Sequence, residues 1–462
     1  MKKLTILLAL PLVFLAEGCS KFTEGYDKDP NNPTEATPAL VLASTELGFY
    51  SNQTSNLARI SVILTQQCAG GLPSQMVNID DYIFTEASNT NEWNNLYNSV
   101  VQPANDLIEN YGANNQNYAA VAKILKAAAI GVATDFWGDV PASEAGYGNI
   151  TGNMTPKFDK QEDVIAYVQS TLDEAIAIIN NADAVNVATM GNDDLIFKGN
   201  MTKWKNVAYI LKARYANRLS KKDASGSATK ALEYLQNVTD AGDAFATYGT
   251  PTAEQNQWYV FNNTRQDYIK MGKFFVDMLN TNNDPRLPFY ATKLTDGTYK
   301  GGAPGAQDQS ASNVGSYLAA ITAPFPLITY TEALFIKAEA SLRAGDAATA
   351  ATAYNAAVTR SVTSVTGAAP SAAFTLAYAS ATAATITQEM IMVQKYIASF
   401  GQPEVWADWR RTGFPALTPN PNAAAGVTGI PRRLPTVVDE RQYNPNAIVV
   451  GNINTPVWWD AQ

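Results

Sequence analysis

The segment LFIKAEASLRAGDAATAATAYNAAV, Leu334 to Val358, decides the fold of this chain of 462 residues. Apolar residues have helical spacing in both of its halves, and Gly345 and Asp346 form the turn between them. The second half has the small, aromatic and small residues of a tetratricopeptide pattern at Ala350, Tyr354 and Ala357. Small residues let two antiparallel helices approach closely, and the aromatic ring fills the space between neighbouring pairs. The segment therefore predicts a stack of helix pairs. Because a single match to the tetratricopeptide pattern is short, a generic helical hairpin is the alternative.

Apolar residues recur at helical spacing along most of the remaining sequence. We expect helices over residues 38–68, 89–110, 117–137, 160–180, 201–220, 227–238, 270–280, 329–344, 346–366 and 385–400. The next best match to a tetratricopeptide pair is formed by residues 213–219 and 231–238. Alternation typical of strands is scarce, with a short candidate at Trp258–Phe261. The sequence therefore predicts a mainly α protein.

Two stretches interrupt the helical pattern. Residues 69–85 contain Gly-Gly and Pro and are predicted to form a loop. Residues 240–325 are rich in Gly, Pro, Asn and Asp, and aromatic residues stand among polar ones there. We interpret this second stretch as an irregular, ligand-side insertion within a single helical domain of residues 38–462. Loops of this kind often carry binding residues.

The N-terminus has the pattern of an exported lipoprotein. In residues 1–18, two lysines precede an apolar run that ends at Leu15, which is typical of a signal peptide. Cys19 resembles the bacterial lipobox cysteine that is acylated, for example with palmitate; an ordinary signal peptide with an incidental cysteine is the alternative. Residues 19–37 are rich in Pro, Asn and acidic residues and predict a tether. The only other cysteine is Cys68, so an acylated Cys19 leaves no intrachain disulfide.

Charge and composition exclude several classes of function. The chain has 33 Lys and Arg against 42 Asp and Glu, a net charge of −9 and a pI near 4.8. Such an acidic chain does not suit nucleic-acid binding, because phosphate neutralisation needs a basic surface. The sequence contains no histidine, which excludes Ser-His-Asp and Cys-His nucleophile systems and removes the commonest transition-metal ligand. We therefore expect no metal, no cofactor and no nucleic-acid partner.

Several short motifs, in order along nearly the whole chain, resemble the SusD/RagB family of outer-membrane lipoproteins. After Cys19 they are DKDPNNPT (27–34), NEWNNLY (91–97), ATDFWGDVPASEA (133–145), DPRLPFY (284–290), YTEALFIKAEASLRAG (330–345), GQPEVWADWRRTGFP (401–415) and PRRLPTVVDERQYNPNA (431–447). Each motif alone is weak, but the set is specific.

This resemblance implies a fold, a partner and a location. The fold would be a right-handed superhelix of four tetratricopeptide-like helix pairs, with irregular segments that form a ligand surface on one side. The partner would be a SusC-like TonB-dependent outer-membrane transporter that receives a glycan or a peptide from the protein. The protein would sit at the cell surface, anchored to the outer membrane by its lipid, and would perform no catalysis.

Ligand contacts are expected where Trp or Tyr lies beside planar polar side chains on a loop. Flat aromatic rings suit the C–H faces of sugars, and peptides need clefts with backbone hydrogen bonds. The candidates are Tyr82 with Asn78 and Asp81, Trp258 and Tyr259 with Gln257, and Tyr299 with Tyr317. The alternative for each is an aromatic folded back on the core, because Trp and Tyr are highly buried on average.

The best matching motifs are expected to have packing roles. These residues are Trp406, Trp409, Arg410 and Arg411 in one motif, and Asp135, Phe136, Trp137 and Asp139 in another.

Two other functions compete with a non-catalytic receptor. A helical glycoside hydrolase needs two carboxylates facing one cleft. Its first candidates are Glu86, Glu92, Asp135, Asp139 and Asp284. A repeat scaffold that binds another protein would be a long regular solenoid, which the irregular residues 240–325 contradict.

Overall fold

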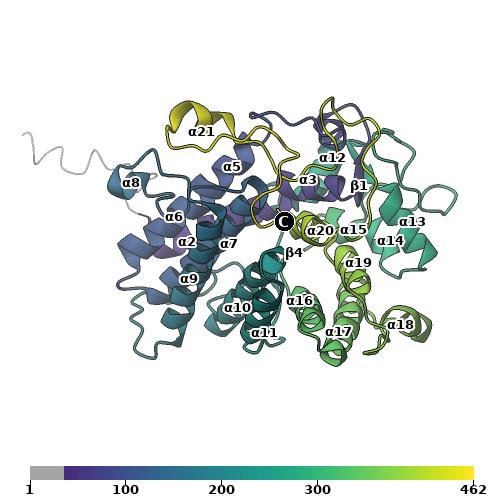
Figure 1. Ribbon diagram of the computed structural model, residues 1–462. Helices are drawn as coiled ribbons and strands as arrows, with labels where there is room; N and C mark the ends of the chain where they lie inside the picture. Colours follow the sequence, from purple (N-terminus) through teal and green to yellow (C-terminus); the bar gives the residue numbers. More distant parts are fainter. Residues whose placement is uncertain (1–35, 462) are drawn as a thin grey trace, which may run out of the picture.

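The computed structural model describes residues 36–461, which fold mainly into helices (Figure 1). The predicted signal peptide, Cys19 and all but the last two residues of the predicted tether lie outside the described residues. No helix in the described part is long and apolar enough to cross a membrane. The predicted mainly α fold class is confirmed.

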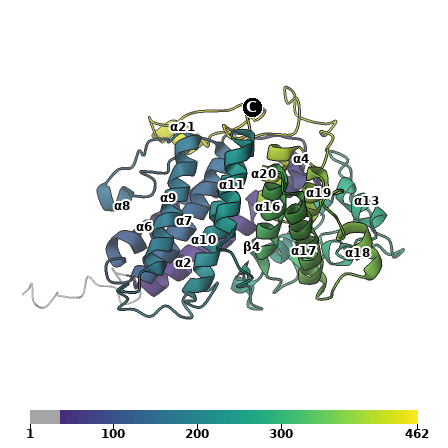
Figure 2. The same cartoon turned by 60° about the horizontal axis from the view of Figure 1, so that its bottom comes forward.

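Four helix pairs stand side by side (Figure 2). In the first pair, α2 (Pro38–Thr54) packs on a continuous long helix composed of α5 (Thr90–Leu96), the π-helical turn η1 (Tyr97–Val101), α6 (Gln102–Asp106) and a second π-helical turn η2 (Leu107–Tyr111). The other three pairs are α7 (Gln116–Trp137) with α9 (Gln161–Asn180), α10 (Met201–Arg218) with α11 (Ala224–Leu235), and α16 (Tyr330–Arg343) with α17 (Ala347–Thr366). The pairs follow the order of the sequence, and α11 packs on α16 across the irregular insertion.

The fourth pair shows why this sequence forms helix pairs. Thr329 caps α16 by accepting a hydrogen bond from the Glu332 N–H, and Asp346 caps α17 in the same way. Gly345 stands at φ +84°, a conformation that favours glycine, and allows the tight turn between the two helices. The small and aromatic residues of the predicted pattern, Ala350, Tyr354 and Ala357, are all buried. The tetratricopeptide interpretation is thus confirmed at the segment that suggested it.

The remaining elements are short. The described strands form two antiparallel pairs, β1 (Cys68–Gly70) with β3 (Ile269–Met271) and β2 (Ala244–Ala246) with β4 (Phe325–Ile328). The other helices of the described part are α3 (Asn56–Leu64), α4 (Gln75–Asp80), α8 (Gly148–Thr151), η3 (Leu219–Lys221), η4 (Thr252–Glu254), α12 (Gln257–Thr264), α13 (Lys273–Thr281), α14 (Leu287–Tyr290), α15 (Ser316–Ala319), α18 (Ala372–Tyr378), α19 (Gln388–Ala398), α20 (Glu404–Thr412) and α21 (Val438–Tyr443).

Three local predictions were wrong. The strand expected at Trp258–Phe261 is part of helix α12, because the Asn256 side chain accepts from the backbone N–H groups of Trp258 and Tyr259 and starts a helix there. The helix expected over residues 38–68 breaks at Ser55 and ends at Leu64. The predicted loop of residues 69–85 contains α4, whose first turn is capped by Ser74.

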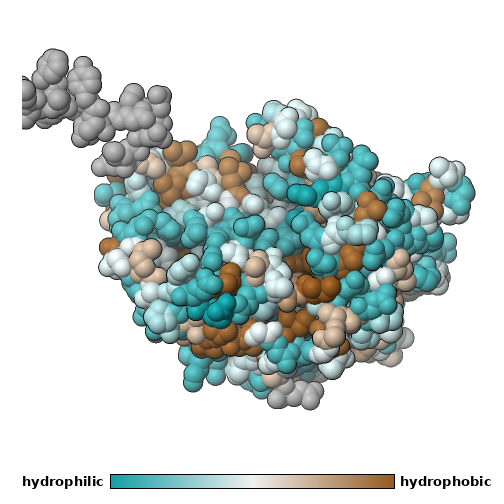
Figure 3. Space-filling view, turned by 90° about the horizontal axis from the view of Figure 1, so that it is seen from above, coloured by the Kyte–Doolittle hydropathy of each residue, from teal (hydrophilic) through white to brown (hydrophobic). Residues whose placement is uncertain are grey.

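The C-terminal segment, residues 415–461, returns across the top of the molecule and covers the helix ends (yellow in Figure 1). The Trp137 indole N–H donates to the Pro435 carbonyl at 3.0 Å, and the Trp406 indole N–H donates to the Pro431 carbonyl at 3.1 Å. Seen from above, this face mixes hydrophilic and hydrophobic residues (Figure 3). The segment therefore joins α7 of the helix layer to α20.

Candidate ligand-binding site

A polar hollow of about 430 Å³ opens beside α12. Most of its lining side chains are planar and polar, and they accompany one aromatic ring. The lining residues are Tyr259, Asn262, Asn263, Gln266, Asp267, Asn313, Val314 and Ala319. They come from α12, from the loop that follows it, from the segment before α15 and from the end of α15.

Helix α12 presents one face to the core and the other to the hollow. Trp258 and Phe261 are buried in the core. Tyr259, Asn262 and Asn263 follow the i, i+3, i+4 spacing of a single helix face, and this face lines the hollow. The Asn262 Nδ2 donates to the Trp258 carbonyl at 2.9 Å, which leaves Oδ1 to accept from a ligand.

The loop after α12 is held against Gly71 and Leu72 by backbone hydrogen bonds. The Leu72 N–H donates to the Asp267 carbonyl at 2.8 Å, and the Gly71 N–H donates to the Tyr268 carbonyl at 3.0 Å. A Cβ atom on Gly71 would lie 2.1 Å from the Asp267 carbonyl oxygen, so only glycine permits this approach. Asp267 itself stands at φ +62°, in the left-handed region that Asp tolerates better than most residues.

A buried lysine orders two of the lining side chains. The Lys270 side chain is 4% exposed, and its Nζ lies 2.6 Å from Asp267 Oδ1 and 2.7 Å from Asn313 Oδ1. The ammonium group therefore balances the carboxylate and orients the amide before any ligand arrives. With its Oδ1 taken, Asn313 has its Nδ2 left to donate.

The structure does not bring all predicted contacts to this hollow. Tyr82 is buried, which raises its pKa to about 12, and its hydroxyl accepts from the Asn420 N–H at 3.0 Å. The Asp81 carboxylate accepts from the Asn420 side chain at 3.0 Å, so Tyr82 and Asp81 hold the C-terminal segment. Asn78 is exposed on α4. None of these three residues lines the hollow.

The remaining predicted contacts are also dispersed, and of the eight only Tyr259 lines the hollow. Trp258 has no exposed surface, which corrects the expectation that its ring faces a ligand. Gln257 lines a separate hollow of about 500 Å³ on the other side of α12. Tyr317 packs edge-on against Tyr290 at 5.1 Å and borders a third hollow of about 390 Å³. Tyr299 is partly buried, and its carbonyl accepts from Asn280.

Sequence reasoning missed most of the lining residues. Asn262, Asn263, Gln266 and Asp267 follow the aromatic residues in NQWYVFNNTRQD, so a cap at Asn256 and helical spacing would have indicated them. Asn313 gave no such signal, because only the tertiary fold brings it to Lys270.

The candidate hydrolase carboxylates take part in separate structural contacts. Glu86 pairs with Arg441 at 2.7 Å, Asp135 with Arg218 at 2.9 Å and Asp284 with Arg286 at 2.6 Å. Asp139 accepts from the Gln161 N–H at 2.8 Å, and Glu92 lies near Arg59. Within residues 36–461, no group of three or more Cys, Asp or Glu residues could hold a metal ion.

The motif residues expected to pack do so. Trp406, Arg410 and Arg411 are buried, with the Arg410 guanidinium 3.9 Å from the centre of the Trp406 ring. Asp135, Phe136 and Trp137 are buried as well, at the end of α7.

Comparison with known proteins places this geometry in a family. A SusD-like family model, described as starch-binding and associating with the outer membrane, matches residues 30–435. No curated protein matches the chain.

Solved structures match over nearly the whole chain. A chitin-binding protein is 28% identical, with a TM-score of 0.78, over 92% of this chain and 100% of its own. A SusD/RagB family protein from Bacteroides thetaiotaomicron is 24% identical, with a TM-score of 0.76, over 92% of this chain and 99% of its own. A chitin-binding SusD homologue from Flavobacterium johnsoniae is 22% identical, with a TM-score of 0.78, over 91% of this chain and 98% of its own.

Proposed function

Because this chain belongs to the SusD-like family, we propose that it is a non-catalytic, lipid-anchored surface protein that binds a glycan in the hollow beside α12. The observation that carries the proposal is the combination of Tyr259 with amide groups and a lysine-held carboxylate around one open hollow. It passes the glycan to a TonB-dependent outer-membrane transporter. Cys19 carries the lipid, and residues 19–37 are the tether.

The lining suits a sugar better than a peptide. An aromatic ring can stack on the apolar C–H face of a sugar, while amide and carboxylate groups bond to its hydroxyls. The hollow offers both a donor and an acceptor, because Asn313 is left to donate and Asn262 is left to accept. The relative that is 28% identical is named as chitin-binding, which supports an oligosaccharide as the ligand class.

The same lining favours binding without hydrolysis. Glycoside hydrolysis by the usual route needs two carboxylates on opposite sides of the scissile bond. Asp267 is the single carboxylate among the lining residues of the hollow, and Lys270 pairs with it.

Calorimetric titration with chitin and starch oligosaccharides and with short peptides tests the proposed ligand class. We expect one oligosaccharide series to bind, and Tyr259→Ala or Asn313→Ala to weaken binding about tenfold or more, through loss of stacking or of a hydrogen bond. Gln257→Ala is the matched control, because Gln257 is exposed on the same helix but lines a different hollow. Release of shorter sugars, or equal losses in the control, would contradict the proposal.

The anchor and the partner need separate tests. Acyl labelling of the wild-type protein and of Cys19→Ala in cells tests lipidation, with label expected only on the wild type. Because the proposed location is the cell surface, protease treatment of intact cells is expected to degrade the protein, and protection would contradict this location. A TonB-dependent transporter is expected to co-purify with the protein.

A further inference from the structure

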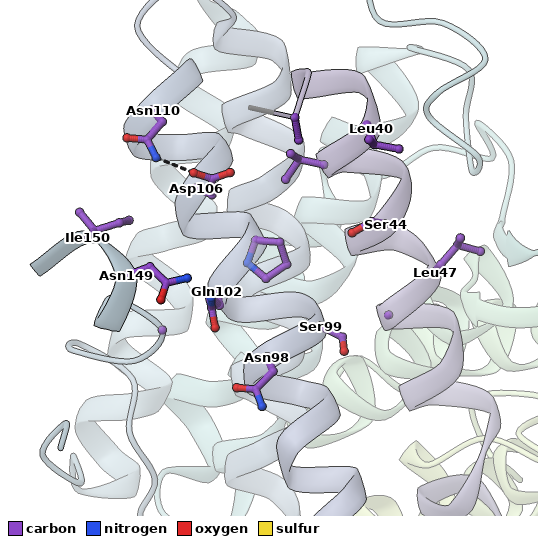
Figure 4. A pocket seen from close by; sticks show the side chains of 15 residues that line it. Leu40, Ser44, Leu47, Asn98, Ser99, Gln102, Asp106, Asn110, Asn149 and Ile150 are labelled. Atoms are coloured by element: carbon purple, nitrogen blue, oxygen red, sulfur yellow. Dashed lines mark hydrogen bonds between the residues drawn. The ribbon is translucent and has the colours of Figure 1, made fainter. Parts of the chain in front are cut away.

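A second, larger hollow of about 830 Å³ lies between α2, the long helix that contains α6, and the short helix α8 (Figure 4). It shares no lining residue with the hollow beside α12. Its lining contains no aromatic side chain, so it lacks the flat ring that suits a sugar. Its ligand therefore belongs to another chemical class.

The long helix presents a ladder of planar polar side chains to this groove. The ladder residues are Asn98, Gln102, Asp106 and Asn110, each four residues after the last. Figure 4 shows them in succession along one helix, between α2 and α8. Among the described residues, the side chains of Asn98 and Gln102 have no hydrogen-bond partner, while Asn110 donates to Asp106. The groove thus holds amide groups that are free to bind.

Two π-helical turns keep the ladder on one face. In a regular α-helix a four-residue step turns the side chain about 40° past a full circle, so residues 98 and 110 would drift apart around the helix. The turns at Tyr97–Val101 and Leu107–Tyr111 hold more residues per turn and offset this drift. Pro103 has no N–H, and the preceding Gln102 N–H bonds to the Tyr97 carbonyl five residues back.

Apolar side chains form the two walls of the groove. On α2, Leu40 is 58% and Leu47 56% exposed, and Ile150 on α8 is 40% exposed. The backbone of the long helix is fixed against α2, because a Cβ on Gly48 would lie 2.3 Å from the Ser99 carbonyl oxygen. The walls are therefore apolar and exposed, and the α2 wall is held at a fixed distance from the ladder.

The spacing of the ladder matches an extended peptide. Four residues of helix rise about 6 Å, and two residues of an extended chain span about 6.6 Å. The free amides of Asn98 and Gln102 can therefore bond the main-chain N–H and C=O of alternate peptide residues, while the side chains between them reach Leu40, Leu47 and Ile150. Asp106 is the single charged residue of the lining, so it favours a cationic side chain.

We propose that this groove binds a short oligopeptide in extended conformation, with apolar side chains at alternate positions and one Lys or Arg opposite Asp106. Three ladder steps cover about 18 Å, which corresponds to five or six bound residues. The groove is a binding site for peptide that is separate from the proposed glycan site.

The probe is a capped, fluorescein-labelled peptide of about eight residues, with Leu alternating with Ser or Thr and one central Lys. We expect saturable binding in fluorescence anisotropy with the full-length protein. The double variant Asn98→Leu, Gln102→Leu is expected to bind at least about tenfold more weakly, through loss of main-chain hydrogen bonds. Both side chains reach solvent, so the fold should persist, and circular dichroism checks this.

Three controls make the test specific. Gln388→Leu removes an exposed amide on α19 and should leave binding unchanged. A probe that is N-methylated at alternate residues should lose binding, because the ladder contacts the main chain. Asp106→Asn should abolish the preference for the Lys probe over a Glu probe.

Several results would overturn the proposal. The first two are a failure of the probe to bind and binding that N-methylation of the probe does not affect. The other two are displacement of the probe by a saccharide and the finding that the protein forms a dimer which the ladder variant disrupts. Glycan binding at the α12 hollow should be the same in the ladder variant, so a failure here is distinguishable from a failure of the proposed function.

Discussion

Asp80 shows how a single buried residue joins segments that are far apart in the sequence. Its Oδ2 accepts from the Gly70 N–H at 3.2 Å and from the Gly305 N–H at 2.9 Å. The Asp80 carbonyl accepts from the Asn420 side chain. Strand β1, the glycine-rich loop and the C-terminal segment therefore meet at this residue, and burial raises the pKa of its carboxyl group to about 7.

This raised pKa predicts an effect of Asp80→Asn on pH dependence. The folded protein holds the Asp80 proton more tightly than the unfolded chain, so the free energy of unfolding falls as pH rises from about 4 to about 7. The asparagine variant should lose this part of the pH dependence, on the order of 2–4 kcal/mol. Urea unfolding of the wild-type protein and of Asp80→Asn at pH 5 and pH 8 measures this difference in the free energy of unfolding.

Asp183→Asn is the matched control for Asp80, because Asp183 is exposed. That variant should keep the wild-type pH dependence. An unchanged pH dependence in Asp80→Asn would show that burial of the carboxyl group does not govern its protonation.

Gly71→Ala should damage both the fold and the glycan site. The new Cβ would lie 2.1 Å from the Asp267 carbonyl oxygen, a backbone atom that can move only if the whole loop shifts. We expect a loss of about 1–3 kcal/mol in stability, as for other overpacked sites, together with weaker oligosaccharide binding. Gly451→Ala, where nothing lies within 4 Å, is the control and should leave both properties unchanged. Normal oligosaccharide affinity in Gly71→Ala would show that binding does not depend on the position of the loop that contains Asp267.

Between elements, buried ion pairs fix how the helices meet. Glu339 of α16 accepts two hydrogen bonds from Arg411 of α20, one at 2.7 Å, and one from Asn217 of α10 at 2.9 Å. Burial alone would raise the pKa of Glu339, but Arg411 and Arg343 lower it to about 2. This carboxylate therefore joins the third and fourth helix pairs to α20.

Glu339→Gln should be strongly destabilising, because it removes one of the two carboxylates that pair with the buried Arg411, leaving only Asp408, and also the carboxylate that pairs with Arg343. We expect a loss of about 3–5 kcal/mol, measured by urea unfolding at pH 7. The contribution of Glu339 is present above pH 4 and is lost as pH falls towards about 2, so the gap to the wild type should narrow in acid. Glu389→Gln, an exposed acid on α19, is the control. A loss below about 1 kcal/mol would contradict the assigned role.

For the whole molecule, the C-terminal segment and the ion pairs indicate one cooperative unit. Arg218 of the third helix pair bonds Asp135 of the second pair and Glu404 of α20. Asp460, near the end of the described chain, pairs with Arg432 and Lys221. Contacts of this kind join the second and third helix pairs to α20 and to the C-terminal segment.

We therefore predict a single unfolding transition for the domain of residues 38–462. Helix loss, followed by circular dichroism, and exposure of the buried Trp137, Trp406 and Trp459, followed by fluorescence, should have the same midpoint in urea. These tryptophans lie where the C-terminal segment covers the helices, so they report its detachment. Two separate midpoints would show that the irregular region or the C-terminal segment unfolds independently.

Local sequence patterns were enough to predict the helix layer, and the set of short motifs was enough to indicate the family. Helical spacing, capping residues and glycine turns act within a few residues, so the pair at residues 334–358 and the packing role of the Trp406 motif could be read directly. The candidate site became visible only in the folded chain. Trp258 looked like a ligand contact and is buried, while Asn313 gave no signal and lies beside Lys270. The physical reason is that irregular loops are positioned by long-range contacts, such as Gly71 against Asp267, that no local pattern encodes.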